Sequence, residues 1–253
     1  MSETRMQLLV VNPNTTPTMT ATIEDAARRV ANPSTDILAV TSSMGPVSIE
    51  GYYDEVFAVP GLLIEIARGE RMGAQAAIIA CFDDTGLDAA RALAGIPVIG
   101  ICEAALSLTA FIAQRFTVVT TMERSRLPVE ALVHRYGMAG RAKVRAADIP
   151  VLSLEDPNSN ARDRLRNEIT AALLEDRAEA IVLGCAGMAE LAADLSREFG
   201  VPVIDGVSAA VKQAEALVAL GLSTAKRGAY ATPVSKAYLG MLEQFAPAAI
   251  LSA

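Results

Sequence analysis

Two cysteines occupy matching positions in two similar stretches of the chain. Cys81 follows the apolar run 77–80 and Cys185 follows the run 180–184. The two cysteines lie 104 positions apart, and the prolines that precede the next apolar run, Pro97 and Pro202, lie 105 apart. Because two copies of one unit commonly pack face to face, we expect the two thiols to face each other across a cleft. A thiolate on one side and a thiol on the other are what two-base proton transfer at a carbon centre requires.

The pKa of each thiol depends on its neighbours. Each cysteine follows a predicted strand and precedes a predicted helix, so the helix amides are expected to favour the thiolate and lower the pKa. Two close thiols titrate as a unit, because ionisation of one raises the pKa of the other. The alternative is that the cysteines only fill space, as buried free cysteines often do. Matched placement favours function for the pair, whereas Cys102 has no counterpart in the second half and is interpreted as a core residue.

Small polar residues follow several predicted strands. The segment 12–16, Asn-Pro-Asn-Thr-Thr, is rich in donors that could meet the negative charge built on oxygen when a proton next to a carbonyl is removed. The same segment is also explained as a turn and an N-cap for a helix that begins near Pro17. The segments 42–46 and 120–121 leave the same two alternatives open, and from the first of these we take Ser43 and Gly45 as candidate contacts.

Two aspartates lie beside the first cysteine. Asp84 or Thr85 is predicted to cap the helix that follows, and Asp83 is a candidate for orienting a substrate N–H group. No arginine or lysine adjoins Cys81 or Cys185, which argues against an anionic substrate.

Short apolar runs alternate with alanine-rich amphipathic stretches along the whole chain. This pattern is typical of strands joined by helices around parallel sheets, and ligands of such sheets bind at the carboxyl ends of the strands. The predicted strands are 7–11, 36–41, 76–80, 97–101, 116–120, 144–147, 180–184 and 202–205. The predicted helices are 17–31, 56–72, 86–93, 103–113, 124–136, 159–176, 189–199 and 207–220.

The repeat divides the chain into parts of similar size. With 253 residues and 52% hydrophobic content, the chain can bury a large core. We predict an α/β fold of two pseudo-symmetric lobes, each with a mainly parallel sheet flanked by helices, and an active site in the cleft between them. The first lobe is expected over 1–100 and the second over 101–205, and the carboxyl segment 206–253 is expected to pack back on the first lobe.

Composition narrows the classes of partner. The net charge is −7 and basic residues form no run, which argues against nucleic acid and against an acidic membrane surface. A signal peptide and a membrane-spanning run are both absent from the sequence, so we expect a cytoplasmic protein that binds a small molecule and forms a homo-oligomer. The three cysteines match neither a disulfide framework nor a zinc pattern, and the single histidine, His134, lies far from both repeats. With neither a nucleotide-binding glycine motif nor a distinctive lysine, the sequence predicts no metal and no organic cofactor.

Several motifs resemble the hydantoin racemase family, which belongs to the aspartate/glutamate racemase superfamily and includes allantoin racemases. They are 12–15 (Asn-Pro-Asn-Thr), 46–50 (Pro-Val-Ser-Ile-Glu), 80–83 (Ala-Cys-Phe-Asp), 183–188 (Leu-Gly-Cys-Ala-Gly-Met) and 203–207 (Val-Ile-Asp-Gly-Val). The resemblance covers nearly the whole chain. It implies a pseudo-symmetric two-lobed α/β fold and a cofactor-independent mechanism in which Cys81 and Cys185 are the acid/base thiols. The ligand contacts that it implies are Asn14, Phe82, Thr120, Thr121, Ala186 and Gly187.

Departures from related motifs bear on the substrate. Amino-acid racemases of the superfamily carry Cys-Asn-Thr and Cys-Thr-His where this chain has 81–83 (Cys-Phe-Asp) and 185–187 (Cys-Ala-Gly), so the groups that hold an α-amino acid are missing. Members of the hydantoin racemase family more often show Cys-Phe-Gly-Asp-Pro-Gly where this chain has 81–86, Cys-Phe-Asp-Asp-Thr-Gly. We therefore expect racemisation of 5-substituted hydantoins, with allantoin as a leading natural candidate.

Two other functions stay open on the sequence alone. One is a carboxylate-acting racemase, decarboxylase or isomerase of the same superfamily. The other is a redox-sensing module in which Cys81 and Cys185 form a reversible disulfide.

Overall fold

Two parallel four-stranded sheets form the framework of the protein. The computed structural model describes residues 5–154, 156 and 158–252. The first sheet has the order β2-β1-β3-β4 and the second the order β6-β5-β7-β8, so corresponding strands hold corresponding places. The strands are β1 (Met6–Asn12), β2 (Thr35–Thr41), β3 (Ala76–Ile79), β4 (Val98–Gly100), β5 (Phe116–Thr120), β6 (Ala142–Ala146), β7 (Ala180–Gly184) and β8 (Val203–Asp205). The predicted α/β architecture of two similar parallel sheets is confirmed.

The repeat seen in the sequence is kept at the level of single hydrogen bonds. The Ala77 N–H donates to the Pro97 carbonyl at 2.9 Å, and the Ile181 N–H donates to the Pro202 carbonyl at the same distance. Ala77 and Ile181 each lie four residues before a cysteine. β3 and β7 therefore deliver Cys81 and Cys185 to equivalent points at the carboxyl edges of their sheets.

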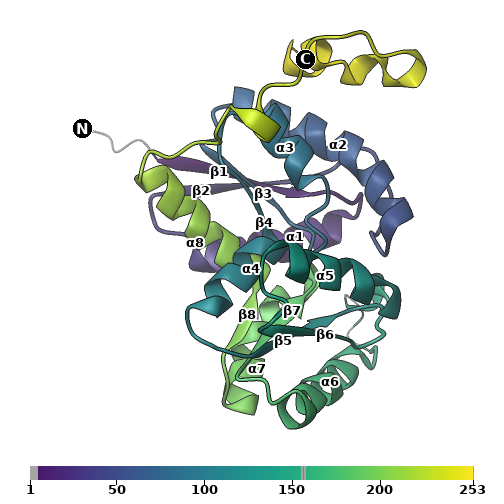
Figure 1. Cartoon of the computed structure of the whole chain (residues 1–253), viewed down its shortest axis with the longest axis vertical. Helices are drawn as coiled ribbons and strands as arrows, with labels where there is room; N and C mark the ends of the chain where they lie inside the picture. Colours follow the sequence, from purple (N-terminus) through teal and green to yellow (C-terminus); the bar gives the residue numbers. More distant parts are fainter. Residues whose placement is uncertain (1–4, 155, 157, 253) are drawn as a thin grey trace.

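Helices cover both faces of each sheet (Figure 1). The helices on the inner faces, between the sheets, are α1 (Pro17–Val30), α4 (Ile101–Ala110), α5 (Glu123–Arg135) and α8 (Gly206–Ala219). On the outer faces α2 (Tyr52–Arg71) and α3 (Leu87–Leu93) cover the first sheet, and α6 (Ala161–Glu175) and α7 (Ala192–Phe199) cover the second. Shorter elements are η1 (Val151–Leu154), η2 (Ala186–Leu191), η3 (Gly228–Tyr230), η4 (Gly240–Phe245) and α9 (Pro247–Ser252).

The core between the sheets is continuous. Val10 and Ile78 of the first sheet and Val118 and Val182 of the second belong to one cluster of buried apolar side chains, and α1, α4 and α8 contribute to it. Alternate residues of the same strands point outward into two separate clusters under the outer helices. Burial on both faces explains why the strands are almost wholly apolar.

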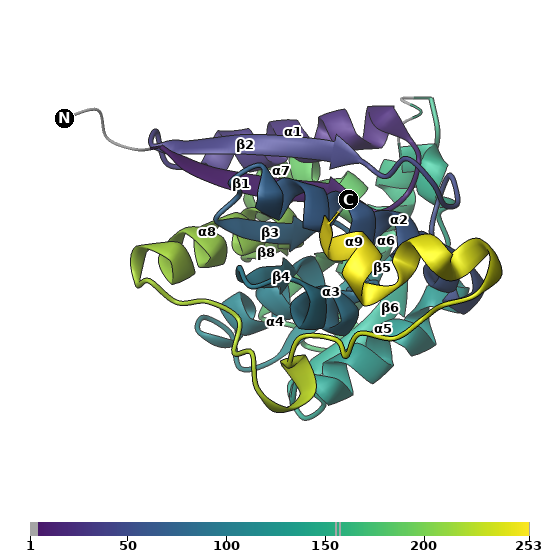
Figure 2. The ribbon, with the colours of Figure 1, turned by 90° about the horizontal axis from the view of Figure 1, so that it is seen from above.

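The carboxyl segment runs from the inner core to the outside of the first sheet. α8 contacts strands of both sheets, namely β3, β4, β7 and β8. Beyond α8 the chain crosses α3, where the Lys226 ammonium donates to the Arg91, Ala92 and Ala94 carbonyls, and ends against α2 (Figure 2). The division of the chain at 100 and 205 stays a prediction. Among the described helices none has both the length and the apolar character that crossing a membrane demands.

Candidate active site

The two matched cysteines line one cavity at the carboxyl edges of both sheets. Cys81 lies two residues after β3 and Cys185 directly after β7, and both are half-buried free thiols. Cys102 is fully buried in the inner core. The cavity measures about 40 Å³, room for water but not for an organic ring, so a substrate must widen it. It is lined by Asn14, Met19, Ile49, Ala80, Cys81, Phe82, Asp83, Thr120, Thr121, Ser125, Val151, Gly184, Cys185 and Ala186.

The thiol pKa values differ from the sequence-based expectation. Burial raises the pKa of Cys185 to about 11, and burial together with the Asp83 carboxylate raises the pKa of Cys81 well above its ordinary value. The predicted lowering by helix amides is therefore wrong in its net direction. The backbone N–H groups of Asp83 and Gly187 do favour the thiolates, but they do not outweigh desolvation and the nearby negative charge.

A buried hydroxyl supports Cys81 specifically. Thr85 is 2% exposed, and its Oγ1 has no partner that meets ordinary hydrogen-bond geometry among the described residues. The hydroxyl interacts with the Cys81 thiol and favours its ionised form. A threonine oxygen that is unsatisfied when Cys81 is a neutral thiol becomes a donor when Cys81 carries charge.

Asparagines after β1 build one wall of the cavity. The Asn12 amide donates to Asn14 Oδ1 at 2.8 Å and to Thr20 Oγ1 at 3.0 Å, so Asn12 is used internally and orients Asn14. Thr16 occupies the N-cap position of α1, yet its hydroxyl donates to the Val47 carbonyl at 2.7 Å rather than capping the helix. Of this segment, Asn14 is the residue that reaches the cavity.

Threonines after β5 build the opposite wall. The Thr120 hydroxyl donates to the Gly184 carbonyl at 3.3 Å, which ties β5 to β7, the strand that precedes Cys185. A Cβ at Gly184 would lie 2.8 Å from the Thr120 Cα, so only glycine allows this approach. The hydroxyls of Thr121 and Ser125 make no hydrogen bond within the described part of the chain, and both side chains are buried at the cavity. They are available to a ligand.

Asp84 caps a helix other than the predicted one. Its carboxylate accepts from the Cys102 and Glu103 N–H groups, both at 3.0 Å, and from the Tyr136 hydroxyl at 2.7 Å. It thus caps α4, while α3 begins after Gly86 without a side-chain cap. Burial raises the pKa of Asp84 to about 7.

Asp83 is the acidic side chain among the described residues that line the thiol cavity. It lines the cavity beside Cys81, and its pKa is raised to about 7 by burial and by the neighbouring carboxyl of Glu55. Neither lysine nor arginine is among the described residues that line this cavity.

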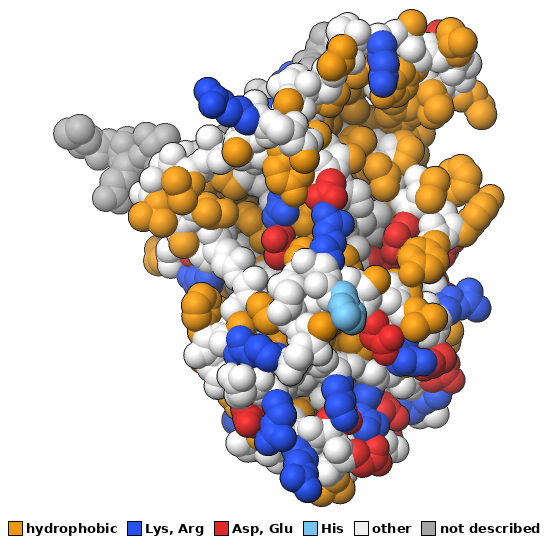
Figure 3. All heavy atoms as spheres, viewed as in Figure 1, with side chains coloured by type: hydrophobic (Ala, Val, Ile, Leu, Met, Phe, Trp, Pro, Cys, Tyr) orange, Lys and Arg blue, Asp and Glu red, His pale blue; other side chains and the backbone are white. Residues whose placement is uncertain are grey.

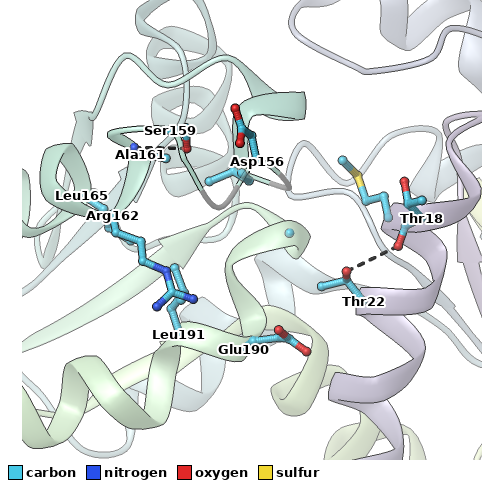
Figure 4. Close-up of a pocket in the computed structure, with 12 residues that line it drawn as sticks. Thr18, Thr22, Asp156, Ser159, Ala161, Arg162, Leu165, Glu190 and Leu191 are labelled. Atoms are coloured by element: carbon cyan, nitrogen blue, oxygen red, sulfur yellow. Dashed lines mark hydrogen bonds between the residues drawn. The ribbon is translucent and has the colours of Figure 1, made fainter.

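A larger cavity of about 530 Å³ lies next to the first. Figure 4 shows Thr18 and Thr22 of α1 on one side, facing Asp156 and Arg162 on the other. Met19 lines both cavities, so movement of this flexible side chain would join them. Glu190 and Leu191 of η2 complete the floor, and Gly187 lies here, next to Cys185.

Most of the predicted site residues lie together. The thiol cavity is lined by Cys81, Cys185, Asn14, Phe82, Thr120, Thr121 and Ala186, and Gly187 lines the larger cavity. Ser43 and Gly45 line neither; both are exposed in the loop after β2, which bonds to the segment 15–16.

Six lining residues were not predicted as contacts: Met19, Ile49, Ala80, Ser125, Val151 and Gly184. Met19 and Ser125 lie in the first turn of the helices that follow β1 and β5. Extending each strand-end segment by one helical turn would have found both. Within the described residues, histidine, cysteine, aspartate and glutamate form no group of three or more that could hold a metal ion.

Comparison with known proteins gives consistent matches. Residues 8–214 match the family model for Asp/Glu/hydantoin racemases. The chain is 50% identical over 236 residues to the hydantoin racemase of Rhizobium meliloti, covering 93% of this chain and 98% of the relative. It is 48% identical over 241 residues to that of Pseudomonas sp. strain NS671, covering 95% and 97%. The solved allantoin racemase from Klebsiella pneumoniae is 49% identical, with a TM-score of 0.93 over 96% of this chain and 99% of that one. The sequence identity to hydantoin racemases is thus nearly the same as the identity to this allantoin racemase.

Proposed function

The chain belongs to the Asp/Glu/hydantoin racemase family and is a racemase, and we propose that it inverts C5 of 5-substituted hydantoins with two cysteine thiols. One observation carries the proposal: Cys81 and Cys185 leave equivalent strands of two sheets and line the same cavity. The mechanism uses neither a metal nor an organic cofactor.

The proposed reaction moves one proton off the substrate and another onto it. A thiolate on one side removes the C5 proton and leaves an enolate, and the thiol on the other side donates its proton to the opposite face of C5. Both cysteines change protonation state in each turnover. Burial and then the nearby Asp83 carboxyl disfavour the Cys81 thiolate, and burial likewise disfavours the Cys185 thiolate.

The enolate oxygen needs hydrogen-bond donors that are already in place. The hydroxyls of Thr121 and Ser125 and the Asn14 amide point to this cavity from two lobes. We assign them to the hydantoin ring carbonyls. Asp83, the charged residue at the cavity, is suited to accept from a ring N–H.

The lining indicates a neutral reacting group. A carboxylate beside two thiols and Asp83 would meet no lysine or arginine among the described lining residues. A hydantoin ring is neutral and presents N–H and C=O edges. We place its C5 substituent past Met19 in the 530 Å³ cavity, where Thr22, Arg162 and Glu190 favour a polar substituent such as the ureido group of allantoin.

A related activity on a carboxylated substrate is the second candidate. Arg162 in the larger cavity is the observation that favours it, because an arginine can hold a carboxylate. Tighter binding of acidic compounds than of hydantoins would support this alternative.

The first test uses deuterated water and one pure enantiomer each of allantoin and 5-benzylhydantoin. Optical rotation reports racemisation, and proton NMR reports loss of the C5–H. We expect both signals to change together, well above the spontaneous rate. No change with either compound would contradict the hydantoin assignment, and loss of two thiols on mild oxidation without proton exchange would favour a redox sensor.

Replacing each cysteine separately tests the two-thiol mechanism. Cys81→Ser and Cys185→Ser are each expected to lower racemisation by at least about a thousandfold, because one face of C5 loses its acid or base. Each variant should still exchange the C5 proton of one enantiomer. Cys102→Ser is the control and should keep turnover, since Cys102 lies outside the cavity. Full racemisation by both cavity variants would end the proposal.

Assembly and location are further proposals. We propose a cytoplasmic homo-oligomer. Apolar side chains gather on the carboxyl segment (Figure 3), including Leu239 and Met241, which are 83% and 92% exposed. Light scattering of the purified protein tests the subunit number.

A further inference from the structure

Asp83 is the residue that two cavities share among the described residues that line them. On one side it faces the thiols in the 40 Å³ cavity. On the other it lines a separate cavity of about 320 Å³ between α2, the loop before α3, and α5. Among the described residues, none lines both the 530 Å³ cavity, through which the substituent extends, and this third cavity. The thiol cavity therefore adjoins two larger cavities: the 530 Å³ cavity on the substrate side and the 320 Å³ cavity behind Asp83.

Glu55 stands behind Asp83 in the third cavity. It lies in the first turn of α2 and lines this cavity together with Asp83, where the two carboxyls interact. The pKa of Asp83 is raised to about 7 and that of Glu55 is raised as well, in both cases mainly by burial. Two carboxyls in contact hold one proton between them near neutral pH, because both cannot be ionised at small cost.

The groups around the pair do not neutralise it. Asp84 in the same loop adds negative charge, and the two cysteines face Asp83 from the thiol cavity. Asp88 of α3 and Arg135 of α5 line the third cavity but form an ion pair with each other. Within the described residues, it is therefore the shared proton that offsets part of the negative charge of Asp83 and Glu55.

A two-thiol racemase ends each turnover in the wrong protonation state for repeating it. When Cys185 has taken a proton and Cys81 has given one, Cys185 is a thiol and Cys81 a thiolate. Before a second molecule of the same enantiomer can react, Cys81 must gain a proton and Cys185 must lose one.

Resting on the proposed function, we propose that Asp83 and Glu55 form a proton relay that reprotonates Cys81 from solvent behind the substrate site. Asp83 gives the shared proton to the Cys81 thiolate, which leaves both carboxyls ionised. Glu55 then takes a proton from water in the third cavity and passes it to Asp83, so that the pair again holds one proton. Cys185 releases its proton to water that enters when product leaves, so one proton enters and one leaves per reset.

Glu55→Gln tests the relay with little change in shape. Glu55 does not line the thiol cavity, so substrate binding and the chemical step keep their residues. At low substrate concentration the two cysteines regain their starting protonation states before the next substrate binds, so the reset does not affect kcat/KM. At saturating substrate the reset limits the rate and therefore sets kcat. We expect kcat to fall at least about tenfold while kcat/KM stays within about threefold of the wild-type value. Imidazole added at increasing concentration should restore kcat of the variant by carrying protons, and leave the wild type unchanged.

Tyr52→Phe is the control, because Tyr52 lines the same cavity and its replacement keeps the ion pair of Asp88 and Arg135. It should keep both kinetic parameters and show no response to imidazole. A parallel loss of kcat and kcat/KM in Glu55→Gln without rescue would overturn the relay, and so would unchanged kcat.

A spectroscopic measurement separates failure of the relay from failure of the proposed function. Infrared difference spectra of the substrate-free protein between about pH 5 and about pH 9 should show loss of one protonated-carboxyl C=O band that is altered in both Asp83→Asn and Glu55→Gln. Absence of that band in the wild type would refute the shared proton even if hydantoins are racemised. Its presence with no hydantoin turnover would refute the proposed substrate instead.

Discussion

Both cavity thiols are hard to ionise, although turnover requires one of them to be a thiolate. Burial holds the pKa of Cys185 at about 11, and Asp83 adds to the raised pKa of Cys81. Such thiols are strong bases once ionised but are rarely ionised at neutral pH. A strong base is useful against a carbon acid, because proton transfer is most efficient when donor and acceptor are matched.

This arrangement predicts a steep pH profile. Since the pKa of Cys185 lies above the working pH, the thiolate fraction and hence kcat/KM should rise about tenfold per pH unit from about pH 7 to about pH 9. Asp83→Asn removes a nearby negative charge, so the pKa values of both thiols should fall and the profile should move to lower pH. The pH profile of kcat/KM is measured from initial rates on one enantiomer, corrected for spontaneous racemisation. A profile that is flat above pH 7 in the wild type would show that a bound substrate or an open site has already lowered the thiol pKa.

At the scale of elements, a single side chain, that of Asp84, joins the loop after β3 to the amino end of α4. Asp84 adopts a left-handed backbone conformation (φ 47°) and places its carboxylate at the amino end of α4. Gly100 leaves the space that this carboxylate occupies. The loop that carries Cys81 is thus tied to α4, the second helix after it, and, through Tyr136, to the end of α5.

Loss of this cap should destabilise the protein. Asp84→Ala leaves two backbone N–H groups and the Tyr136 hydroxyl without their acceptor, and we expect the free energy of unfolding to fall by about 2 kcal/mol or more. Tyr136→Phe removes one of the three bonds and should cost about 1 kcal/mol. Urea unfolding followed by circular dichroism gives both values. Equal stability of Asp84→Ala and the wild type would show that water replaces the cap.

At the scale of the whole molecule, the lobes are not independent. One buried cluster contains strand residues of both sheets, and α8 contacts both. Separation of the lobes would expose this cluster to water.

The protein should therefore unfold in one cooperative transition. We expect coincident curves from circular dichroism and tyrosine fluorescence, and equal calorimetric and van't Hoff enthalpies. The isolated segment 1–100 should not fold, because it lacks α4 and α8, which cover the inner face of its sheet. Two resolved transitions, or a folded 1–100 fragment, would show that the lobes are separate cooperative units.

Much of the fold follows from local pattern, and β5 and β7 have the bounds predicted for them. α2 was the main error in bounds, since it begins at Tyr52, four residues before the predicted start. The exposed Tyr52 and Tyr53 carry no apolar periodicity, whereas the Asp54 carboxylate that receives the Glu50 N–H marks the beginning of this helix.

The sequence by itself determined the two sheets, the pair of thiols and most of the residues around them, because strand periodicity and a repeated frame are local properties of the chain. The tertiary structure decided the direction of the thiol pKa shifts, the helix that Asp84 caps, and the contact between Asp83 and Glu55. Each of these depends on which groups, distant along the chain, exclude water from the same few ångströms. Desolvation and charge–charge interaction act through space, so no spacing in the sequence reports them.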